Sequence, residues 1–305
     1  MKHDQLGQYT DIDPLITRWQ EQLELSLLHN FGIKRGTVHI SALSRAVREL
    51  AMHTSLPIED AIRLCCKVPM EHDVMRIVVP HCTVSETYFF RHPEHFRWVR
   101  EVFIPHLRRR NPATANRRQI RCWSAGCSTG EEAYSLAITL SECLTADEQW
   151  DISILATDLN PESLAFARKA IYGAWSFRGM SEEVRSRYFT PIFQSTPQVP
   201  VLPHLQRYQL DASIARLVTF GELNLHASDW SGSLVDGRSF DLILCRNVAI
   251  YFNRPQIHGL LHRFARLLDP EGVLVVGPSE SWTLNDSCFR PLISGKGSIF
   301  VLSGN

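Results

Sequence analysis

The chain has 305 residues, of which 44% are hydrophobic, and its equal numbers of basic and acidic side chains give a formal net charge of zero. This length allows one large or two modest domains, and the neutral charge argues against a general binder of polyanions. No run of about 18 apolar residues predicts a membrane-spanning helix, and the first residues, MKHDQLGQYT, lack the apolar core of a signal peptide. We therefore expect a soluble, cytoplasmic protein.

The first part of the chain is predicted to be helical. Apolar residues recur at helical spacing over Leu15–Phe31 and over Ser41–Met52, and a third helix is expected to begin near Ile58. We therefore expect an N-terminal helical domain over residues 1–80 and a linker over residues 81–119. The run Leu107–Arg121 contains six arginines and no acid, which favours an exposed connector.

A strand–helix alternation begins at Ile120, and it predicts an α/β domain over residues 120–305 with a mostly parallel sheet and helices on both faces. Residues 187–219 interrupt this rhythm with four prolines, so we expect a small antiparallel β-unit to be inserted there. The strands expected in that unit are Arg207–Leu210 and Ile214–Val218. The other expected strands are Ile120–Ser124, Ile152–Asp158, Leu217–Leu225, Phe240–Arg246, Gly272–Gly277 and Ser298–Ser303, and the expected helices are Glu131–Cys143, Pro161–Ala170 and Pro255–Leu268.

The most informative segment is R-C-W-S-A-G-C-S-T-G-E-E-A-Y-S, in which an apolar strand leads through a loop of small residues into a helix. Small side chains and Gly126 let the backbone approach a ligand closely, and the start of the helix offers unpaired N–H groups. The loop lacks both the lysine of a phosphate-binding loop and the G-x-G-x-x-G spacing. Instead, the acids Glu131 and Glu132 follow it, and they favour a ligand with positive charge and hydroxyl groups, such as S-adenosylmethionine. The alternative is a tight turn capped by Ser128 or Thr129.

The second expected strand, I-S-I-L-A-T-D-L-N, carries Asp158 at its end. An acid at this position is where α/β nucleotide-binding folds hold ribose hydroxyls, and a carboxylate can accept two hydrogen bonds from a vicinal diol. Alternatively, Asp158 caps the helix that begins at Pro161. Together with the upstream loop, Asp158 favours the interpretation as a cofactor site.

The eight cysteines are scattered and form no C-x-x-C pair, so we expect reduced thiols and no zinc site. Cys245 lies at a strand end, but no adjacent base is visible that would activate a nucleophilic thiol. We therefore expect Cys245 to be a small core residue.

Five motifs in order carry a family resemblance. They are T-Y-F-F-R, W-S-A-G-C-S-T-G-E-E, A-T-D-L-N, A-R-K-A-I-Y and C-R-N-V-A-I-Y-F. With these motifs the chain resembles the chemoreceptor glutamate methyltransferases of the CheR family, from about residue 20 to residue 303. The resemblance implies a Rossmann-like S-adenosylmethionine-dependent methyltransferase core, with an N-terminal helical domain and an inserted β-subdomain. It also implies esterification of receptor glutamates, with S-adenosylhomocysteine as the product.

The resemblance also implies which residues contact the cofactor. Ser85 stands where the family often has Asn, and Gly126 lies in the loop described above. The positions carried over from the family's motifs are Thr87, Arg91, Glu132, Asp158, Asn224, Leu225, Arg246 and Asn247.

Two of these motifs supply candidate catalytic residues. A glutamate carboxylate is already ionised near neutral pH and needs no general base, so its alignment with the methyl group is most of the catalysis. Arg91 can orient a carboxylate bidentately, either that of the cofactor or that of the substrate. Tyr251 can donate a hydrogen bond to the incoming glutamate, and Glu132 can bind the cofactor ammonium. The alternatives are a surface ion pair for Arg91 and an aromatic core position for Tyr251.

Basic residues of the helical domain are candidates for binding the acidic receptor helices. Arg45 and Arg48 are three positions apart on one helix and hence on one face, and Lys34 and Arg35 precede that helix. The alternative is an ordinary solvated helix face.

Some relatives in this family bind a receptor's C-terminal peptide on the β-subdomain by strand addition. The corresponding stretch, Phe193–Gln206, has three prolines and no glycine, and Leu210–Ile214 has no glycine either. Proline blunts a strand edge, so we expect no such peptide tether and expect docking through the N-terminal domain or a module beyond Asn305. The alternative is a tether that binds through a loop of different shape.

Two rival functions remain at this stage. One is a methyltransferase for another substrate, although the N-P-P-Y tetrapeptide of amine methylation is absent and no broad basic face predicts nucleic-acid binding. The other is a signalling scaffold that binds the cofactor without turnover. We expect contact with membranes only through the receptors.

Overall fold

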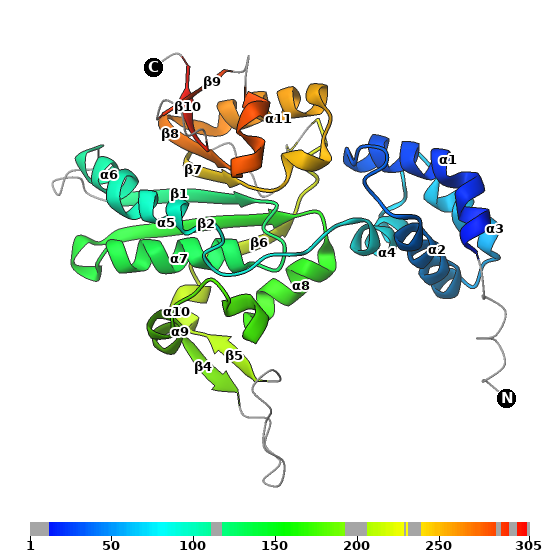
Figure 1. Ribbon diagram of the computed structural model, residues 1–305. Coiled ribbons are helices and arrows are strands. Elements are labelled where there is room, and N and C mark those ends of the chain that lie inside the picture. The colour runs from blue at the N-terminus through cyan, green and yellow to red at the C-terminus, as the bar shows by residue number, and fades with distance from the viewer. Residues whose placement is uncertain are drawn as a thin grey trace, which may run out of the picture. The chain divides into compact units, whose positions relative to one another are not determined.

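The computed structural model describes residues 12–110, 118–192, 206–228, 230, 239–284, 288–292 and 298–303 (Figure 1). The chain forms two units. The first consists of Met1–Val84, Asn224–Ser228 and Ile250–Ile257, and the second of Ser85–Leu223, Asp229–Ala249 and His258–Asn305. Among the described residues, no helix is both long and apolar enough to cross a membrane.

The described residues 12–84 of the first unit contain four α-helices. The three helices predicted from apolar spacing are confirmed, and the first ends at Gly32, whose φ of 76° a residue with a side chain rarely adopts. The fourth helix contains Pro80 and was not predicted, although its buried residues Val74, Val78 and Cys82 recur at helical spacing. The helices are α1 (Asp13–Phe31), α2 (Ile40–Thr54), α3 (Ile58–Cys65) and α4 (His72–Cys82).

The second unit contains a seven-stranded, mostly parallel sheet, as predicted. Its first five strands pair in parallel, and β10 runs antiparallel to both of its neighbours. In spatial order the strands are β6 (Val218–Glu222), β2 (Trp150–Asp158), β1 (Arg118–Ala125), β7 (Phe240–Cys245), β8 (Leu268–Val276), β10 (Ile299–Leu302) and β9 (Phe289–Pro291).

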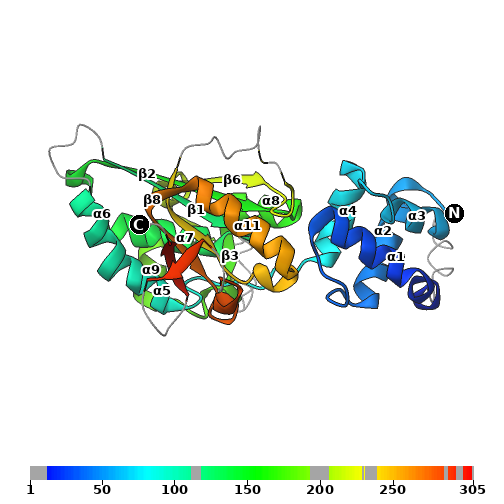
Figure 2. The same ribbon diagram turned by 90° about the horizontal axis from the view of Figure 1, so that it is seen from above.

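Helices cover both faces of this sheet because successive strand side chains point to opposite sides. Cys122 of β1 belongs to the core that α7 (Glu131–Cys143) covers. Its neighbour Trp123 meets Phe264 of α11 (Arg254–Leu267) edge to face, with ring centroids 5.3 Å apart. In Figure 1, α11 lies above the parallel strands and α7 below them, and Figure 2 shows α11 over the strands from above. The helix α8 (Pro161–Lys169) also packs on β2 and β6.

The predicted small antiparallel sheet is confirmed, although its first strand lies upstream of the predicted insertion. Its strands are ordered β3 (Ile171–Gly173), β5 (Arg207–Leu210) and β4 (Phe189–Ile192). The predicted strand Ile214–Val218 is wrong, because Asp211 accepts a hydrogen bond from the Ser213 N–H and caps the short helix α10 (Ala212–Ala215). The stretch 193–205, on which the tether prediction mainly rests, lies outside the described residues.

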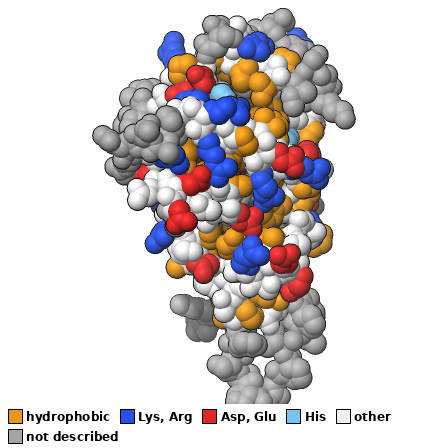
Figure 3. Space-filling view, turned by 90° about the vertical axis from the view of Figure 1, so that its left-hand side faces the viewer, with side chains coloured by type: hydrophobic (Ala, Val, Ile, Leu, Met, Phe, Trp, Pro, Cys, Tyr) orange, Lys and Arg blue, Asp and Glu red, His pale blue; other side chains and the backbone are white. Residues whose placement is uncertain are grey.

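The prediction of an exposed arginine connector is wrong for its first residues. Leu107 is fully buried in α6 (Ile104–Arg110), which follows α5 (Pro93–Trp98) and the π-helical turn Val99–Phe103. The run Leu107–Arg121 contains no acid, and two of its arginines pair with acids from distant segments: Arg108 with Glu148 at 2.9 Å and Arg110 with Asp269 at 2.6 Å. On the face that Figure 3 shows, basic and acidic side chains are interspersed among hydrophobic ones.

Phe89 joins the small sheet to the main core. It is fully buried, stacks on Phe177 with ring centroids 5.4 Å apart, and meets Tyr172 and Phe189 edge-on at 4.8 and 5.0 Å. Tyr172 belongs to β3 and Phe189 to β4, so one side chain of the T-Y-F-F-R motif contacts both outer strands of the small sheet.

We expect Phe89→Ala to lower the free energy of unfolding by about 3–5 kcal/mol, because it leaves a cavity among the three rings that Phe89 contacts. Urea denaturation followed by circular dichroism measures this change. Phe166→Ala, at a ring that is 40% exposed, is the control and should cost clearly less. Equal losses in the two variants would contradict the central position of Phe89.

Candidate active site

The order of the strands places a ligand site at the carboxyl ends of β1 and β7. From β1 the chain moves outward to β2 and β6 and then returns to β7 on the other side of β1. Open α/β sheets bind ligands in the crevice at such a switch point. The small-residue loop follows β1, and Arg246 and Asn247 follow β7, so these segments meet where the topology predicts a site.

The loop after β1 depends on glycine. Gly126 and Gly130 have φ values of 82° and 93°, and a Cβ atom on Gly126 would collide with the side chain of Val248. The alternative of a turn capped by Ser128 or Thr129 is wrong. Gly130 occupies the N-cap position of α7, and the Thr129 hydroxyl donates instead to the Glu131 carboxylate at 2.6 Å.

Asp158 links this loop to the end of β2. Its Oδ2 accepts the Ser128 N–H at 2.7 Å, and its Oδ1 accepts the Asn160 N–H at 2.8 Å. The alternative role as a helix cap is wrong, because the Asn160 side chain caps α8. Burial raises the pKa of Asp158, while backbone N–H donors act in the opposite direction. A carboxylate offers about four acceptor positions, so Asp158 still has the capacity to bind a ribose diol.

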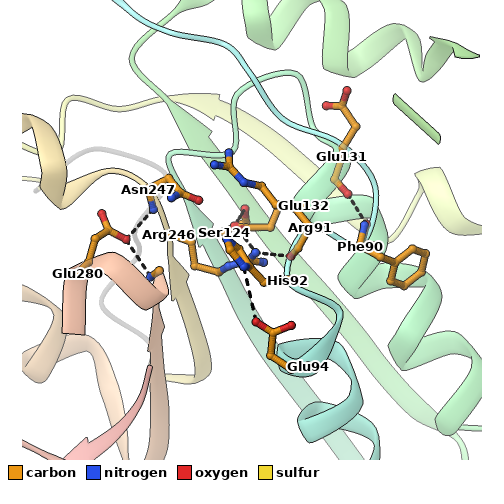
Figure 4. Close-up of polar contacts among 12 residues, drawn as sticks. Phe90, Arg91, His92, Glu94, Ser124, Glu131, Glu132, Arg246, Asn247 and Glu280 are labelled. Carbon is orange, nitrogen blue, oxygen red and sulfur yellow. Dashed lines mark hydrogen bonds and ion pairs between the residues drawn. The ribbon is translucent and has the colours of Figure 1, made fainter. Parts of the chain in front are cut away.

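Glu132 and Arg246 form a buried ion pair beneath the loop (Figure 4). Glu132 accepts a hydrogen bond from the Ser124 hydroxyl at 2.7 Å, and its other oxygen lies 3.3 Å from Nη1 of Arg246, whose side chain is only 2% exposed. Burial raises the pKa of Glu132, and the Arg246 cation opposes that shift. Among the described residues, Nε and Nη1 of Arg246 have no hydrogen-bond partner of good geometry. This pair therefore retains donor capacity next to the loop.

Arg91 lies beside this pair. Arg246 donates to the Arg91 carbonyl, and the Phe90 N–H donates to the Ser135 hydroxyl at 2.9 Å, which fixes the T-Y-F-F-R segment to α7. The Arg91 guanidinium donates to the Glu86 carbonyl at 2.9 Å. Within the described part of the chain it has no ion-pair partner, so the proposed surface ion pair is not observed there.

Two further buried acids lie near the site, and of these Glu280 was not singled out from the sequence. Glu280 is fully buried and accepts the N–H groups of Asn247 and Gly277 at 2.6 and 2.8 Å, which holds Asn247 at a φ of 60° (Figure 4). Glu131 accepts hydrogen bonds from Thr129 and from Ser176 at 2.9 Å, although its backbone starts the same helix as Glu132. No periodic pattern marks Glu280, since it accepts hydrogen bonds from backbone N–H groups, one distant in the chain and one within a turn.

The remaining cofactor candidates in the second unit are Ser85 and Thr87, which precede Arg91 in the chain. The Ser85 hydroxyl is 3.0 Å from the Ser163 hydroxyl of α8. Thr87 is half-buried in the extended segment that leads to Arg91. Ser85 thus has a structural partner even though it differs from the Asn that relatives often carry.

Asn224, Leu225 and Tyr251 belong to the first unit. The Asn224 amide donates to the Asn30 carbonyl at 2.7 Å, and the Tyr251 carbonyl accepts the Lys34 N–H at 2.9 Å. Leu225 is buried, whereas the Tyr251 side chain is only half-buried and so is not a fully enclosed core residue. The predicted strand Leu217–Leu225 is too long, because β6 ends at Glu222.

The basic residues proposed for docking differ in their surroundings. Arg35 pairs with Glu21 at 3.2 Å and with Glu24 at 3.5 Å, so much of its charge is neutralised locally. Lys34 and Arg45 are exposed, and Arg48 is half-buried. Arg45 and Arg48 on α2 are therefore the stronger candidates.

The structure gives no support for thiol or metal chemistry in the residues that it describes. Burial raises the pKa of the Cys245 thiol well above its ordinary value, so it stays protonated. No group of three or more metal-ligating side chains occurs in the described ranges.

The donor set at the switch point suits S-adenosylmethionine. A loop without bulky side chains admits the ligand, the Asp158 carboxylate can accept from ribose hydroxyls, and the buried Glu132 carboxylate can bind an ammonium group. The unsatisfied donors of Arg246 can bind a carboxylate.

We expect Asp158→Ala to weaken S-adenosylmethionine binding by about 1.5–3 kcal/mol, because charge-assisted hydrogen bonds to the ribose are lost. Isothermal titration calorimetry measures this change, and Asp151→Ala, an exposed position at the start of the same strand, serves as the control. Unchanged affinity in Asp158→Ala would contradict the ribose assignment.

Comparison with known proteins agrees with this geometry. Residues 85–296 match the family model described as CheR methyltransferase, SAM binding domain. A probable chemotaxis protein methyltransferase of Rhizobium etli is 33% identical over 243 residues, which cover 79% of this chain and 82% of that protein. The chemotaxis protein methyltransferase of Escherichia coli is 36% identical over 66% of this chain and 62% of its own length. A probable biofilm formation methyltransferase, WspC of Pseudomonas aeruginosa, is 28% identical over 89% of this chain and 59% of its own length. The chain therefore belongs to the CheR methyltransferase family and carries its S-adenosylmethionine-binding domain.

Proposed function

We propose that this protein transfers a methyl group from S-adenosylmethionine to glutamate side chains of chemoreceptor cytoplasmic domains, in the cytoplasm. The observation that carries this proposal is the position of Arg91. Its backbone is bonded to the buried Arg246, which pairs with Glu132 in the cofactor site, while its guanidinium has no carboxylate partner in the described part of the chain. A cation is thus available beside the cofactor for an incoming carboxylate.

The chemistry requires little beyond alignment. When bound, S-adenosylmethionine supplies an electrophilic methyl group, and the glutamate carboxylate is already a nucleophile at neutral pH. Arg91 keeps N–H donors beyond the one that it gives to the Glu86 carbonyl, so it can hold one carboxylate oxygen while the other attacks. Tyr251 donates a hydrogen bond to the same carboxylate.

The decisive experiment is transfer of label from methyl-labelled S-adenosylmethionine to purified receptor cytoplasmic fragments. Glutamate methyl esters release the label as methanol in mild base, whereas methylated amines keep it. Base-labile label at receptor glutamates, lost when those glutamates are replaced by aspartate or alanine, supports the proposal. Label that resists base, or no label on any fragment, would contradict it.

We expect Tyr251→Phe to lower kcat about 10- to 100-fold while the affinity for S-adenosylmethionine stays nearly normal, because the lost hydroxyl aligns the substrate carboxylate and does not bind the cofactor. Arg91→Ala should lower kcat/KM for the receptor fragment at least as much. Steady-state kinetics and calorimetry on the same preparations separate the two effects. Full turnover by Tyr251→Phe would show that this tyrosine only packs.

We also propose that the helical domain, residues 1–80, docks the receptor through α2. The double variant Arg45→Glu, Arg48→Glu should raise KM for the receptor fragment, most strongly at low salt, where charge steering is least screened. Arg63→Glu is the control, because Arg63 on α3 is exposed and paired with Asp60. If the double variant and the wild type have the same KM at low salt, α2 is an ordinary solvated face.

A further inference from the structure

An exposed tryptophan stands out in the second unit. Trp175, in the short 3-10 helix Ala174–Phe177, is 70% exposed, more than any other large hydrophobic side chain among the described residues. The neighbouring Ser176 is fixed on two sides, since its hydroxyl donates to Glu131 and its carbonyl accepts the Phe89 N–H at 2.9 Å. The indole is therefore held at the surface by a rigid segment anchored to the start of α7.

Trp175 is the outer member of a stack of alternating aromatic rings and arginines. The Arg178 guanidinium lies 4.3 Å from the Trp175 ring centroid and 3.9 Å from that of Tyr88. The Arg91 guanidinium lies 6.0 Å from the Tyr88 ring centroid. We call these four side chains, Trp175, Arg178, Tyr88 and Arg91, the cation–aromatic ladder.

The ladder is fixed by further contacts. Arg178 donates to the Trp175 carbonyl at 2.9 Å and pairs with Glu86 at 3.3 Å. Gly179 makes room for Tyr88, because a Cβ atom there would lie 3.0 Å from the Tyr88 ring and 2.7 Å from the Phe89 carbonyl oxygen. Side chains held in this way lose little conformational entropy when a partner binds.

Both the composition and the charge of the ladder indicate a protein partner. Tryptophan, tyrosine and arginine are the side chains most enriched at binding hot spots, and a large exposed indole gains apolar burial when it is covered. The ladder has two cations. Arg178 pairs with the Glu86 carboxylate, whereas Arg91 donates to the Glu86 backbone carbonyl and has no ion-pair partner among the described residues, so its charge favours an acidic partner. The inner end of the ladder is Arg91, the residue that we propose holds the substrate carboxylate.

We propose that the cation–aromatic ladder binds the substrate helix on either side of the glutamate that is methylated. This inference rests on the proposed function. A helix that presents a glutamate to Arg91 also presents the side chains three and four positions away on the same face. An apolar side chain of that face covers Trp175, and an acidic one reaches Arg178. The ladder thereby selects glutamates that have both an apolar and an acidic neighbour on one helix face.

The test compares Trp175→Ala, Trp175→Phe and the control Val102→Ala, an apolar side chain that is 45% exposed outside the ladder. We expect Trp175→Ala to raise KM for a receptor cytoplasmic fragment about tenfold or more. Its kcat at saturating fragment and its affinity for S-adenosylmethionine should stay within about twofold of the wild type. Trp175→Phe should recover most of the loss, and Val102→Ala should behave as wild type. An unchanged KM in Trp175→Ala would overturn the ladder proposal while leaving glutamate methylation intact.

Equilibrium binding keeps the two proposals separable. If the wild type methylates no receptor glutamate, the proposed function fails, and binding of the same fragment then decides on the ladder. Fragment binding that weakens about tenfold in Trp175→Ala supports the ladder as a surface for acidic helices. Binding that is equal in both proteins, or absent in the wild type, overturns it.

Discussion

The buried ion pair between Glu132 and Arg246 is the interaction around which the site is organised. Taking two charges out of water is costly, and a lone partner left in the interior costs about 3–5 kcal/mol. The pair joins the first turn of α7 to the end of β7, and Arg246 extends it to the backbone of the T-Y-F-F-R segment. Three segments far apart in the sequence are thereby fixed by one guanidinium.

Three other carboxylates also fix segments of the backbone near the carboxyl ends of the strands. Asp158 holds the loop after β1, Glu280 holds the turn after β7, and Glu131 holds the segment that carries Ser176. Each accepts hydrogen bonds from N–H or O–H groups that would otherwise be unsatisfied in the interior. Non-glycine residues with positive φ, Ser128 and Asn247, lie at the first two of these points, so the acids stabilise backbone conformations that are unfavourable by themselves.

The sequence was sufficient for what depends on local pattern. Apolar periodicity predicted α1 to α3 and the parallel strands, and the small-residue motif predicted the strand, loop and helix of β1 and α7, because these signals lie within a few neighbouring residues. It was insufficient for partners distant in the chain. Arg108 and Arg110 pair with acids from distant segments, and Glu280 accepts N–H groups of the turn after β7. The helical turn α10 depends on a single cap, Asp211.

The same charges explain how one crevice can serve a cationic cofactor and an anionic substrate. Glu132 and Asp158 favour a ligand with an ammonium group and hydroxyls, but two bare carboxylates would repel an approaching glutamate. Arg246 is buried against Glu132 and reduces that repulsion from within. Arg91 is half-buried on the T-Y-F-F-R segment, whose backbone Arg246 contacts, and its charge makes the potential positive where a substrate arrives. In the ladder, Arg178 adds a second positive charge farther from the cofactor site, and Trp175 is the outermost side chain. In the proposed complex, the positive charges attract the acidic helix, and Trp175 supplies the apolar contact that stabilises it.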